Sequence, residues 1–330
     1  MVSGQSLSRD LAAQAMEEIM TGEATPSQIA SFITALRMKG ETVEEIAGLA
    51  GVMRAKAARV QIATEVVDTC GTGGDGIGAF NVSTAAAFVA AGAGLTVAKH
   101  GNRAASSRSG SADVLEALGV KIDLGPDAVK TCLEQIGFGF MFAPVFHPAM
   151  KHAAGPRREI GVRTVFNLLG PLTNPAGAKS QVLGVADGNL IEKMARALSL
   201  LGCRHVLVVH GEDGMDEVSL TQPTTVCEVR GGETSTYQVA PEDFGMTRAP
   251  HSEIEGRTPD ESAAIIRAVL AGAKGPSRDI VLLNAAAALV AGDRVSSLQE
   301  GVKLAGDVID RGLALQKLAA LAELSQFLGK

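Results

Sequence analysis

Residues 68–84, DTCGTGGDGIGAFNVST, carry four glycines within six positions. Glycine adopts positive φ without strain and lets backbone N–H groups converge on an anion, because no Cβ blocks the approach. Val66 and Val67 predict a strand before this loop, and residues 81–87 predict a helix after it. The unpaired N–H groups and the dipole of a helix N-terminus also favour anions. Strand, glycine loop and helix therefore predict a binding site for phosphate groups.

Two other phosphate-binding motifs compete for this loop. Three of its glycines match G-x-G-x-x-G, the dinucleotide fingerprint, which also requires an acidic residue about 20 positions later to bind the ribose. The next predicted strand, residues 95–98, is instead followed by Lys99 and His100. Asp75 inside the loop would also repel a pyrophosphate unless a metal ion or a sugar hydroxyl intervened. A dinucleotide site is therefore the less favoured interpretation, and a P-loop is excluded because the chain has no G-K-[ST].

Hydrogen-bond donors follow the second predicted strand. Residues 99–111, KHGNRAASSRSGS, contain four basic residues, four serines, an asparagine and two glycines before a helix predicted over residues 112–118. Donors this dense at a strand end favour a phosphate or a sugar phosphate. The structural alternative is a solvated serine-rich connection. The neighbouring glycine loop favours the phosphate site.

Negative charge follows a third predicted strand, residues 206–209. The next residues, 210–217, read HGEDGMDE. Mg²⁺ takes one or two carboxylates and completes its shell with phosphate oxygens and water. A solvated acidic turn is the common alternative. Beside two predicted phosphate sites, this segment favours a diphosphate bridged by a metal ion.

Composition limits the class of protein. The chain has 330 residues, 46% of them hydrophobic and 20% charged, and a net charge of -6. These values predict a globular protein with one large core and a smaller one, and they weigh against general nucleic-acid binding, which needs a basic face. Four cysteines without a C-x-x-C pair predict reduced thiols and a cytoplasmic protein. We find neither a signal peptide nor a stretch apolar enough to span a membrane.

Periodicity predicts an α/β fold. Residues 7–21, 27–38 and 42–58 have helical patterns and form a small all-helical N-terminal domain. Strand and helix patterns alternate from Val66 onward, which predicts a largely parallel central sheet flanked by helices. A hairpin over residues 225–239 and four C-terminal helices complete the chain, and residues 162–180 read as an irregular insertion. Ligand loops then fall at the carboxyl ends of the strands, where such sheets bind substrates.

These clusters, together with HPAMKHAAGPRREIGVRTVFNLLGPLTNPA at residues 147–176, resemble the anthranilate phosphoribosyltransferases of tryptophan biosynthesis nearly end to end. The resemblance implies transfer of phosphoribosyl from 5-phosphoribosyl 1-pyrophosphate to the amino group of anthranilate, with pyrophosphate released. It also implies Mg²⁺ and a homodimer formed through the helical domain. Part of the insertion returns to that domain, which divides the chain into residues 1–64 with a returning segment near 162–180, and an α/β domain of residues 65–161 and 181–330.

The resemblance also assigns the donor site and the metal site. Ser83, Asp216 and Glu217 match the Mg²⁺-binding positions. Ala79 departs from many relatives, which carry a hydroxyl residue there, and this change is expected to weaken donor binding and leave the chemistry intact. The residues matching the phosphoribosyl pyrophosphate site are Gly71, Thr72, Gly73, Gly74, Asp75, Asn81, Val82, Ser83, Thr84, Lys99, His100, Gly101, Asn102, Arg103, Ala104, Ala105, Ser106, Ser107 and Ser111.

Recognition of the acceptor is implied for a second set. Arg157 is matched to the anthranilate carboxylate, which its planar two-donor fork suits, and only the family pattern selects it over Arg158. An aromatic amine is neutral at pH 7 and needs no strong base, so no residue is assigned as a certain catalyst. His100 and His147 are weak candidates for accepting the proton. The complete acceptor set is Gly71, Asn102, Arg157, His100, His147, Pro144 and Gly170.

Two other functions remain open at this point. A pyrimidine nucleoside phosphorylase also handles phosphate and ribose, although KHGNR beside GTGGD and the acidic pair favours a diphosphate donor. A non-catalytic, nucleic-acid-binding paralogue of the same fold is the second. The net charge and the presence of Asn102, Arg157, Asp216 and Glu217 argue against it.

Overall fold

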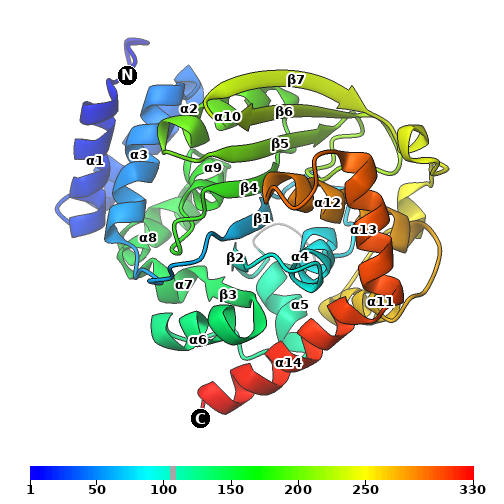
Figure 1. Cartoon of the computed structure of the whole chain (residues 1–330). Helices are drawn as coiled ribbons and strands as arrows, with labels where there is room; N and C mark the ends of the chain where they lie inside the picture. The colour runs from blue at the N-terminus through cyan, green and yellow to red at the C-terminus, as the bar shows by residue number, and fades with distance from the viewer. Residues whose placement is uncertain (105–108) are drawn as a thin grey trace.

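A seven-stranded sheet forms the centre of the computed structural model, which describes residues 1–104 and 109–330 (Figure 1). The strand order is β3-β2-β1-β4-β5-β6-β7. The first five strands in this order are parallel, whereas β6 and β7 form an antiparallel hairpin at one edge. The strands are β1 Val67–Gly71, β2 Val97–Gly101, β3 Phe138–Phe142, β4 Ser180–Gly184, β5 His205–Gly211, β6 Thr224–Arg230 and β7 Glu233–Val239.

Helices cover both faces of this sheet and form a separate group at the N-terminus. They are α1 Arg9–Thr21, α2 Pro26–Lys39, α3 Val43–Lys56, α4 Val82–Gly92, α5 Ser111–Ala117, α6 Pro126–Ile136, α7 Ala143–Phe146, α8 Lys151–Ile160, α9 Phe166–Leu169, α10 Ile191–Leu200, α11 Pro259–Leu270, α12 Pro276–Ala291, α13 Leu298–Asp310 and α14 Leu313–Leu328. Short 3₁₀ turns occur at η1 Pro148–Met150, η2 Gly170–Leu172, η3 Gly188–Leu190, η4 Pro241–Phe244 and η5 His251–Glu253.

The sheet separates two hydrophobic cores because side chains alternate along each strand. Val182 and Leu207 lie in the core that contains α4 and α12. Leu183 and Val206 lie in the other core, with α10 and the N-terminal helices. The alanine-rich helix α4 is buried along nearly its whole length, so its small side chains let it pack closely beneath β1 and β2.

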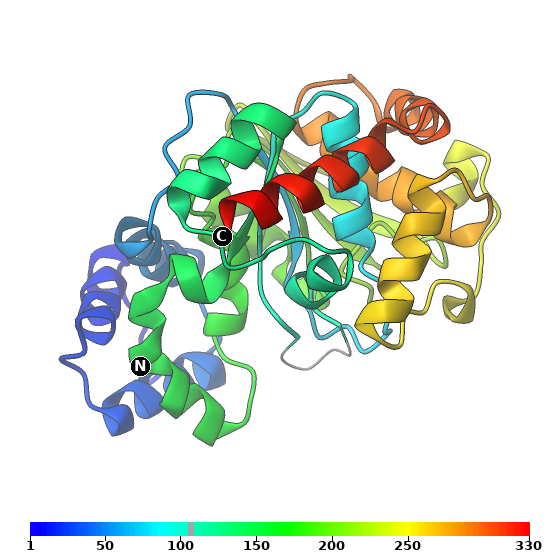
Figure 2. The same cartoon turned by 90° about the horizontal axis from the view of Figure 1, so that it is seen from below.

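Helices α1, α2 and α3 begin at well-formed caps. Thr25 and Thr42 each form a capping box, with Gln28 and Glu45 as the reciprocal partners. Helix α8 packs against α1 and α2, and α9 packs against α3. Figure 2 shows the blue N-terminal helices grouped with green helices from the middle of the chain. A segment far away in the sequence therefore completes this helical group.

The predicted fold class is confirmed, while several details differ. The second strand begins at Val97 and includes Lys99, His100 and Gly101 instead of ending at Ala98. Its start is delayed because the Leu95 N–H still donates to the Ala90 carbonyl at the end of α4. Helix α8 was not predicted, since Gly155 and Pro156 interrupt its pattern. The predicted domain boundaries stay a prediction.

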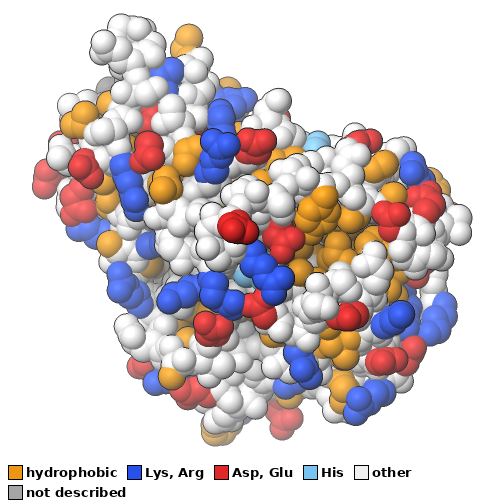
Figure 3. Space-filling model, turned by 45° about the horizontal axis from the view of Figure 1, so that its top comes forward, with side chains coloured by type: hydrophobic (Ala, Val, Ile, Leu, Met, Phe, Trp, Pro, Cys, Tyr) orange, Lys and Arg blue, Asp and Glu red, His pale blue; other side chains and the backbone are white. Residues whose placement is uncertain are grey.

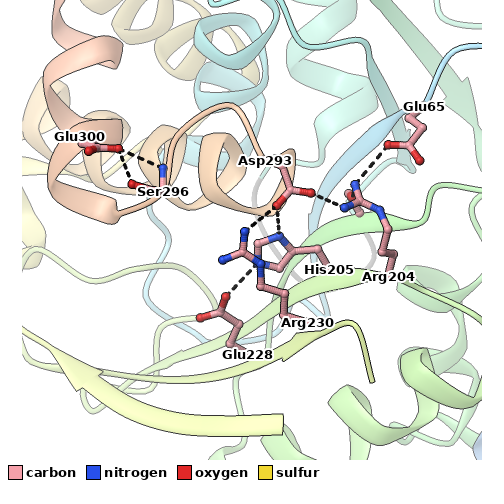
Figure 4. Close-up of polar contacts among 9 residues, drawn as sticks. Glu65, Arg204, His205, Glu228, Arg230, Asp293, Ser296 and Glu300 are labelled. Atoms are coloured by element: carbon pink, nitrogen blue, oxygen red, sulfur yellow. Dashed lines mark hydrogen bonds and ion pairs between the residues drawn. The ribbon is translucent and has the colours of Figure 1, made fainter. Parts of the chain in front are cut away.

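Charged side chains meet at the amino edge of the parallel strands, opposite their carboxyl ends. We call Arg204, His205, Glu228, Arg230 and Asp293 the amino-edge cluster (Figure 4). The two ring nitrogens of buried His205 lie 2.8 Å from Asp293 Oδ1 and 2.9 Å from Glu228 Oε1. Arg204 and Arg230 also pair with Asp293, whose φ is +51°. Each member of this cluster is hydrogen-bonded to another member.

No helix among the described residues has the length and apolar character needed to cross a membrane. The face drawn in Figure 3 carries Lys and Arg side chains close to Asp and Glu, with an apolar patch beside them. Charges of both signs are therefore interspersed on this face.

Candidate active site

The predicted ligand loops meet at the carboxyl edge of the sheet. Strands β1, β4 and β5 run parallel in register, with Gly71 opposite Gly184 and Gly184 opposite Val209. The acidic segment that follows β5 folds back over these ends. A Cβ at Gly71 would lie 2.3 Å from Asp216 Oδ2, and one at Gly184 would lie 1.5 Å from the Asp216 carbonyl oxygen. Glycine at both positions therefore lets Asp216 reach the glycine loop.

The glycine loop is shaped by positive φ angles. Gly73 and Gly74 have φ of +64° and +77°, which side chains rarely allow. The Gly73 N–H donates to Asp216 Oδ2 at 2.7 Å, and the Thr72 N–H donates to the Gly184 carbonyl at 2.9 Å. These bonds hold the loop at the ends of β1 and β4.

Three carboxyl groups crowd this loop. Loss of hydration raises the pKa of Asp216 to about 6, with the charge of Asp75 as the second cause. The same loss of hydration raises the pKa of Glu217 to about 8, with Asp216 as the second cause and Lys99 opposing it. The pKa of Asp75 is also raised by loss of hydration. Groups that repel one another in this way favour a bound cation.

Lys99 and Ser83 complete the acidic site. Lys99 is buried, and its Nζ donates to the Thr69 carbonyl at 2.5 Å and lies 3.3 Å from Ser83 Oγ. The Ser83 N–H donates to Glu217 Oε1 at 3.2 Å. Among the residues that the structure describes, no group of three or more His, Cys, Asp or Glu side chains could enclose a metal. Two carboxylates and one hydroxyl instead fit Mg²⁺, which keeps open positions for phosphate oxygens and water.

A cleft of about 530 Å³ lies beside this acidic site. Residues of α3, α8 and the sheet edge share its wall, so Met53 of the helical group faces residues of the sheet across it. The seven residues expected for the acceptor all line this cleft: Gly71, His100, Asn102, Pro144, His147, Arg157 and Gly170. The structure therefore brings together residues that lie far apart in the sequence.

Two histidines form an uncharged wall of the cleft. The ring centroids of His100 and His147 lie 5.0 Å apart. Burial lowers the pKa of His100 to about 3, with the neighbouring His147 as the second cause, and burial lowers the pKa of His147 to about 4. Both Nε2 atoms are buried and lack a hydrogen-bond partner in the described part of the chain. The rings are thus neutral at pH 7 and leave two polar atoms free.

Arg157 and Arg158 differ in their surroundings. Arg157 lines the cleft, and its guanidinium lies 5.0 Å from the ring centroid of Phe166. Burial lowers its pKa, and it makes no ion pair within residues 1–104 and 109–330. Arg158 is exposed and does not line the cleft. The geometry therefore favours Arg157 as the cation available to an acidic ligand.

Known proteins share this architecture. A model described as "Glycosyl transferase family, a/b domain" matches residues 63–315, and one described as "Glycosyl transferase family, helical bundle domain" matches residues 1–57. The anthranilate phosphoribosyltransferase of Dehalococcoides mccartyi is 56% identical over 99% of this chain and 97% of its own length. That of Thermomicrobium roseum is 58% identical over 100% of this chain and 96% of its own length. The chain belongs to the anthranilate phosphoribosyltransferase family.

Solved structures agree with this membership. The anthranilate phosphoribosyltransferase of Thermus thermophilus has a TM-score of 0.94 and 47% identity, over 98% of both chains. The Saccharomyces cerevisiae enzyme in complex with PRPP and Mg has a TM-score of 0.89 and 31% identity, over 97% of this chain and 94% of its own. The family resemblance and the glycosyltransferase class expected from the sequence are confirmed.

Some residues expected at the family's donor site have other contacts. Arg103 forms ion pairs with Asp113 and Glu116, and its guanidinium carbon lies 5.7 Å from the centroid of the Phe142 ring. The Asn81 side chain bonds Ser109 instead of capping α4.

The other residues expected at the donor site lie near the carboxyl edge of the sheet or in the first turn of a helix. The hydroxyl of Ser111 lies 2.1 Å from the point that a Cβ at Gly101 would occupy. Val82 and Thr84 are buried in α4, while the Ala104 N–H donates to Asp113. Ala105, Ser106 and Ser107 lie outside the described residues.

Two polar residues beneath the site, Asp68 and Asn174, were not predicted from the sequence. Asp68 is buried and accepts from the His100 N–H at 3.2 Å and from Asn174 Nδ2 at 2.7 Å. Burial raises its pKa to about 6, which Lys99 opposes. Asn174 also donates to the Ala98 carbonyl at 2.8 Å. A buried aspartate inside an apolar strand was a signal for this network, but its partner lies 106 positions away.

Proposed function

We propose that this protein transfers the phosphoribosyl group of 5-phosphoribosyl 1-pyrophosphate to the amino group of anthranilate, giving N-(5-phosphoribosyl)anthranilate and pyrophosphate. One observation carries the proposal: the cleft that holds Arg157 and the uncharged histidines opens beside the glycine loop and the crowded carboxylates. An acceptor and a phosphorylated donor can thus be bound next to each other. Holding two reactants in this way lowers the entropic part of the barrier.

Donor binding is assigned to the glycine loop and the start of α4. Backbone N–H groups near Gly74 and Asp75, together with the N-terminal residues of α4 and buried Lys99, supply donors and positive charge for the diphosphate. Mg²⁺ would be held by Ser83, Asp216 and Glu217, and would neutralise charge on the departing pyrophosphate. The bond from ribose C1 breaks with positive charge developing on the sugar, so stabilising the leaving group is the main demand.

Acceptor binding is assigned to the cleft. We assign Arg157 to the anthranilate carboxylate, which it would bind through two parallel hydrogen bonds. His100, His147, Pro144, Gly170 and Asn102 supply the wall. With pKa values of about 3 and 4, the two histidines are poor proton acceptors, and we assign them to the wall rather than to base catalysis. The aromatic amine attacks in its neutral form, so positioning is sufficient.

The proposal includes a cytoplasmic homodimer without nucleic-acid or membrane partners. Leu11 of α1 and Met38 of α2 are 52% and 84% exposed, which supports an apolar contact through the helical group. Ile29, Ile33 and Leu36 are buried within the chain and are unavailable for it. The four cysteines are free thiols. Sedimentation analysis of the wild type and of Met38→Glu tests the dimer.

The direct test of function is the loss of anthranilate fluorescence on mixing with phosphoribosyl pyrophosphate, with and without Mg²⁺. We expect fluorescence to fall only when both substrates and the metal are present. Thymidine with inorganic phosphate is the matched control for a nucleoside phosphorylase. If thymine were released and anthranilate were not consumed, the protein would be a nucleoside phosphorylase and the proposed function would be wrong.

A further inference from the structure

Arg163 lies on the glycine loop although sequence analysis gave it no role. Its Nη2 donates to the Thr72 carbonyl at 3.0 Å. Its Nη1 lies only 1.6 Å from the point that a Cβ of Gly74 would occupy. The guanidinium therefore rests directly against Gly74, and a side chain at that position would displace it.

The backbone that carries Arg163 is fixed. The Thr164 N–H donates to Asn167 Oδ1 at 3.0 Å, and the Asn167 N–H donates to the Thr164 carbonyl at 2.9 Å. Thr164 is buried, and Asn167 lines the cleft. This segment joins the end of α8 to α9, so Arg163 is placed by rigid elements and is not a loose surface side chain.

The guanidinium remains largely available to a ligand. It is exposed, and the bond to Thr72 is its only hydrogen bond within the described ranges. An arginine has five N–H donors in a planar fork that matches phosphate oxygens. Within residues 1–104 and 109–330, Arg163 forms no ion pair. Its positive charge nevertheless lowers the pKa of Asp216. A cation with free donors therefore stands on the loop to which the diphosphate is assigned.

We infer that Arg163 is a further donor-binding residue, which contacts the diphosphate of the phosphoribosyl donor through the N–H groups that Thr72 leaves free. The inference rests on the proposed function, since it names one more residue of the same site. Charge-assisted hydrogen bonds to phosphate are about twice as strong as neutral ones. Arg163 would thus hold the leaving group from the segment that follows α8.

The test measures binding of inorganic pyrophosphate with Mg²⁺ by calorimetry, and steady-state constants for both substrates. Arg163→Met should raise the pyrophosphate Kd and the apparent donor constant about 10-fold or more, the value expected for a lost charge-assisted bond. The anthranilate constant should change less than about twofold. Arg163→Lys should restore part of the binding because it keeps the charge and loses the fork. Arg158→Met, which removes an exposed charge from the same region, is the control.

Each outcome decides the inference. An unchanged pyrophosphate Kd in Arg163→Met, with an active wild type, would overturn it. Equal losses for donor and anthranilate, or a Tm lowered along with them, would also overturn it by making Arg163 a support of the loop. Reduced pyrophosphate binding with a normal Tm and partial rescue by lysine would support it. Failure of the wild type to consume anthranilate would instead count against the proposed function.

Discussion

The amino and carboxyl edges of the central sheet differ in whether their polar side chains have partners within the chain. At the amino edge, each member of the amino-edge cluster is hydrogen-bonded to another member, and the bond from His205 lowers the pKa of Glu228. At the carboxyl edge, burial raises the pKa values of Asp216 and Glu217. A neighbouring carboxylate, Asp75 for Asp216 and Asp216 for Glu217, raises each of them further. In the described part of the chain, His100 and His147 there keep ring nitrogens without a partner.

This difference identifies which edge binds ligands. A buried polar group without a partner costs folding free energy, whereas a paired one need not. Under the proposed function, a cation, a phosphate and an acceptor would supply the partners that the carboxyl edge lacks. The amino edge is already complete within the chain, so its charges fix the positions of β5, β6 and the turn after α12. Substitutions at the two edges should therefore separate activity from stability.

The largest effect is expected from the acidic pair. Asp216→Ala or Glu217→Ala should lower kcat/KM about 100-fold, or about 3 kcal/mol, because a principal charge-stabilising group is lost. The free energy of unfolding should not fall by more than about 1 kcal/mol. Steady-state kinetics and urea unfolding measure the two quantities. Glu212→Ala, at an exposed position of the same loop, is the control. Normal rates in both variants would remove the metal-binding role.

Arg157→Met should act on one substrate. Losing a two-bond contact with a carboxylate costs about 2 kcal/mol, which is about 30-fold in the apparent anthranilate constant. The donor constant should stay within about twofold, and Arg158→Met should leave both constants unchanged. Initial rates at varied concentrations of each substrate provide the measurement. If the apparent constants for donor and anthranilate rose equally in Arg157→Met, Arg157 would not be a specific contact of the anthranilate carboxylate.

Asp293→Ala tests the opposite edge. It leaves His205, Arg204 and Arg230 without their shared partner, so the free energy of unfolding should fall by about 2 kcal/mol. The folded variant should keep wild-type kcat/KM. Urea denaturation followed by circular dichroism measures the first and rate assays the second. Glu300→Ala, which breaks an exposed contact with Ser296, is the control and should change the free energy of unfolding much less. A loss of activity at full stability would contradict the contrast between the edges.

The last prediction concerns the pH dependence of stability in the absence of metal. Glu217 has a folded pKa of about 8, above its ordinary value of 4.5, so the folded state binds more protons than the unfolded state between these values. Its contribution to stability is therefore full below pH 4.5 and is lost as the pH rises toward 8. Between pH 5 and 8, the Tm of the wild type should fall relative to that of Glu217→Gln. The fall should be about 2 °C for each kcal/mol by which the free energy of unfolding of the wild type decreases. Mg²⁺ should raise the wild-type Tm at pH 8, and parallel curves for the two proteins would contradict this.

Local patterns in the sequence were enough to predict the main elements and the chemistry of the ligand loops. Alternating strand and helix signals predicted the parallel sheet, because periodicity follows from which side of an element is buried. The glycine loop at residues 71–76 and the acids at 216–217 were recognisable because backbone freedom and charge are properties of neighbouring residues. Since parallel strands end at one edge, these loops were also expected to meet there.

Local patterns could not predict which distant side chains line the same wall of the cleft, or which of them lack a partner in the described part of the chain. Three features depend on contacts that form only when the chain folds. They are the different surroundings of Arg157 and Arg158, the neutral pair His100 and His147, and the contact of Arg163 with Gly74. Burial and the absence of a partner set their charge and availability, and neither property is written in the spacing of residues. For the same reason the sequence did not separate the completed amino-edge cluster from the incomplete carboxyl edge.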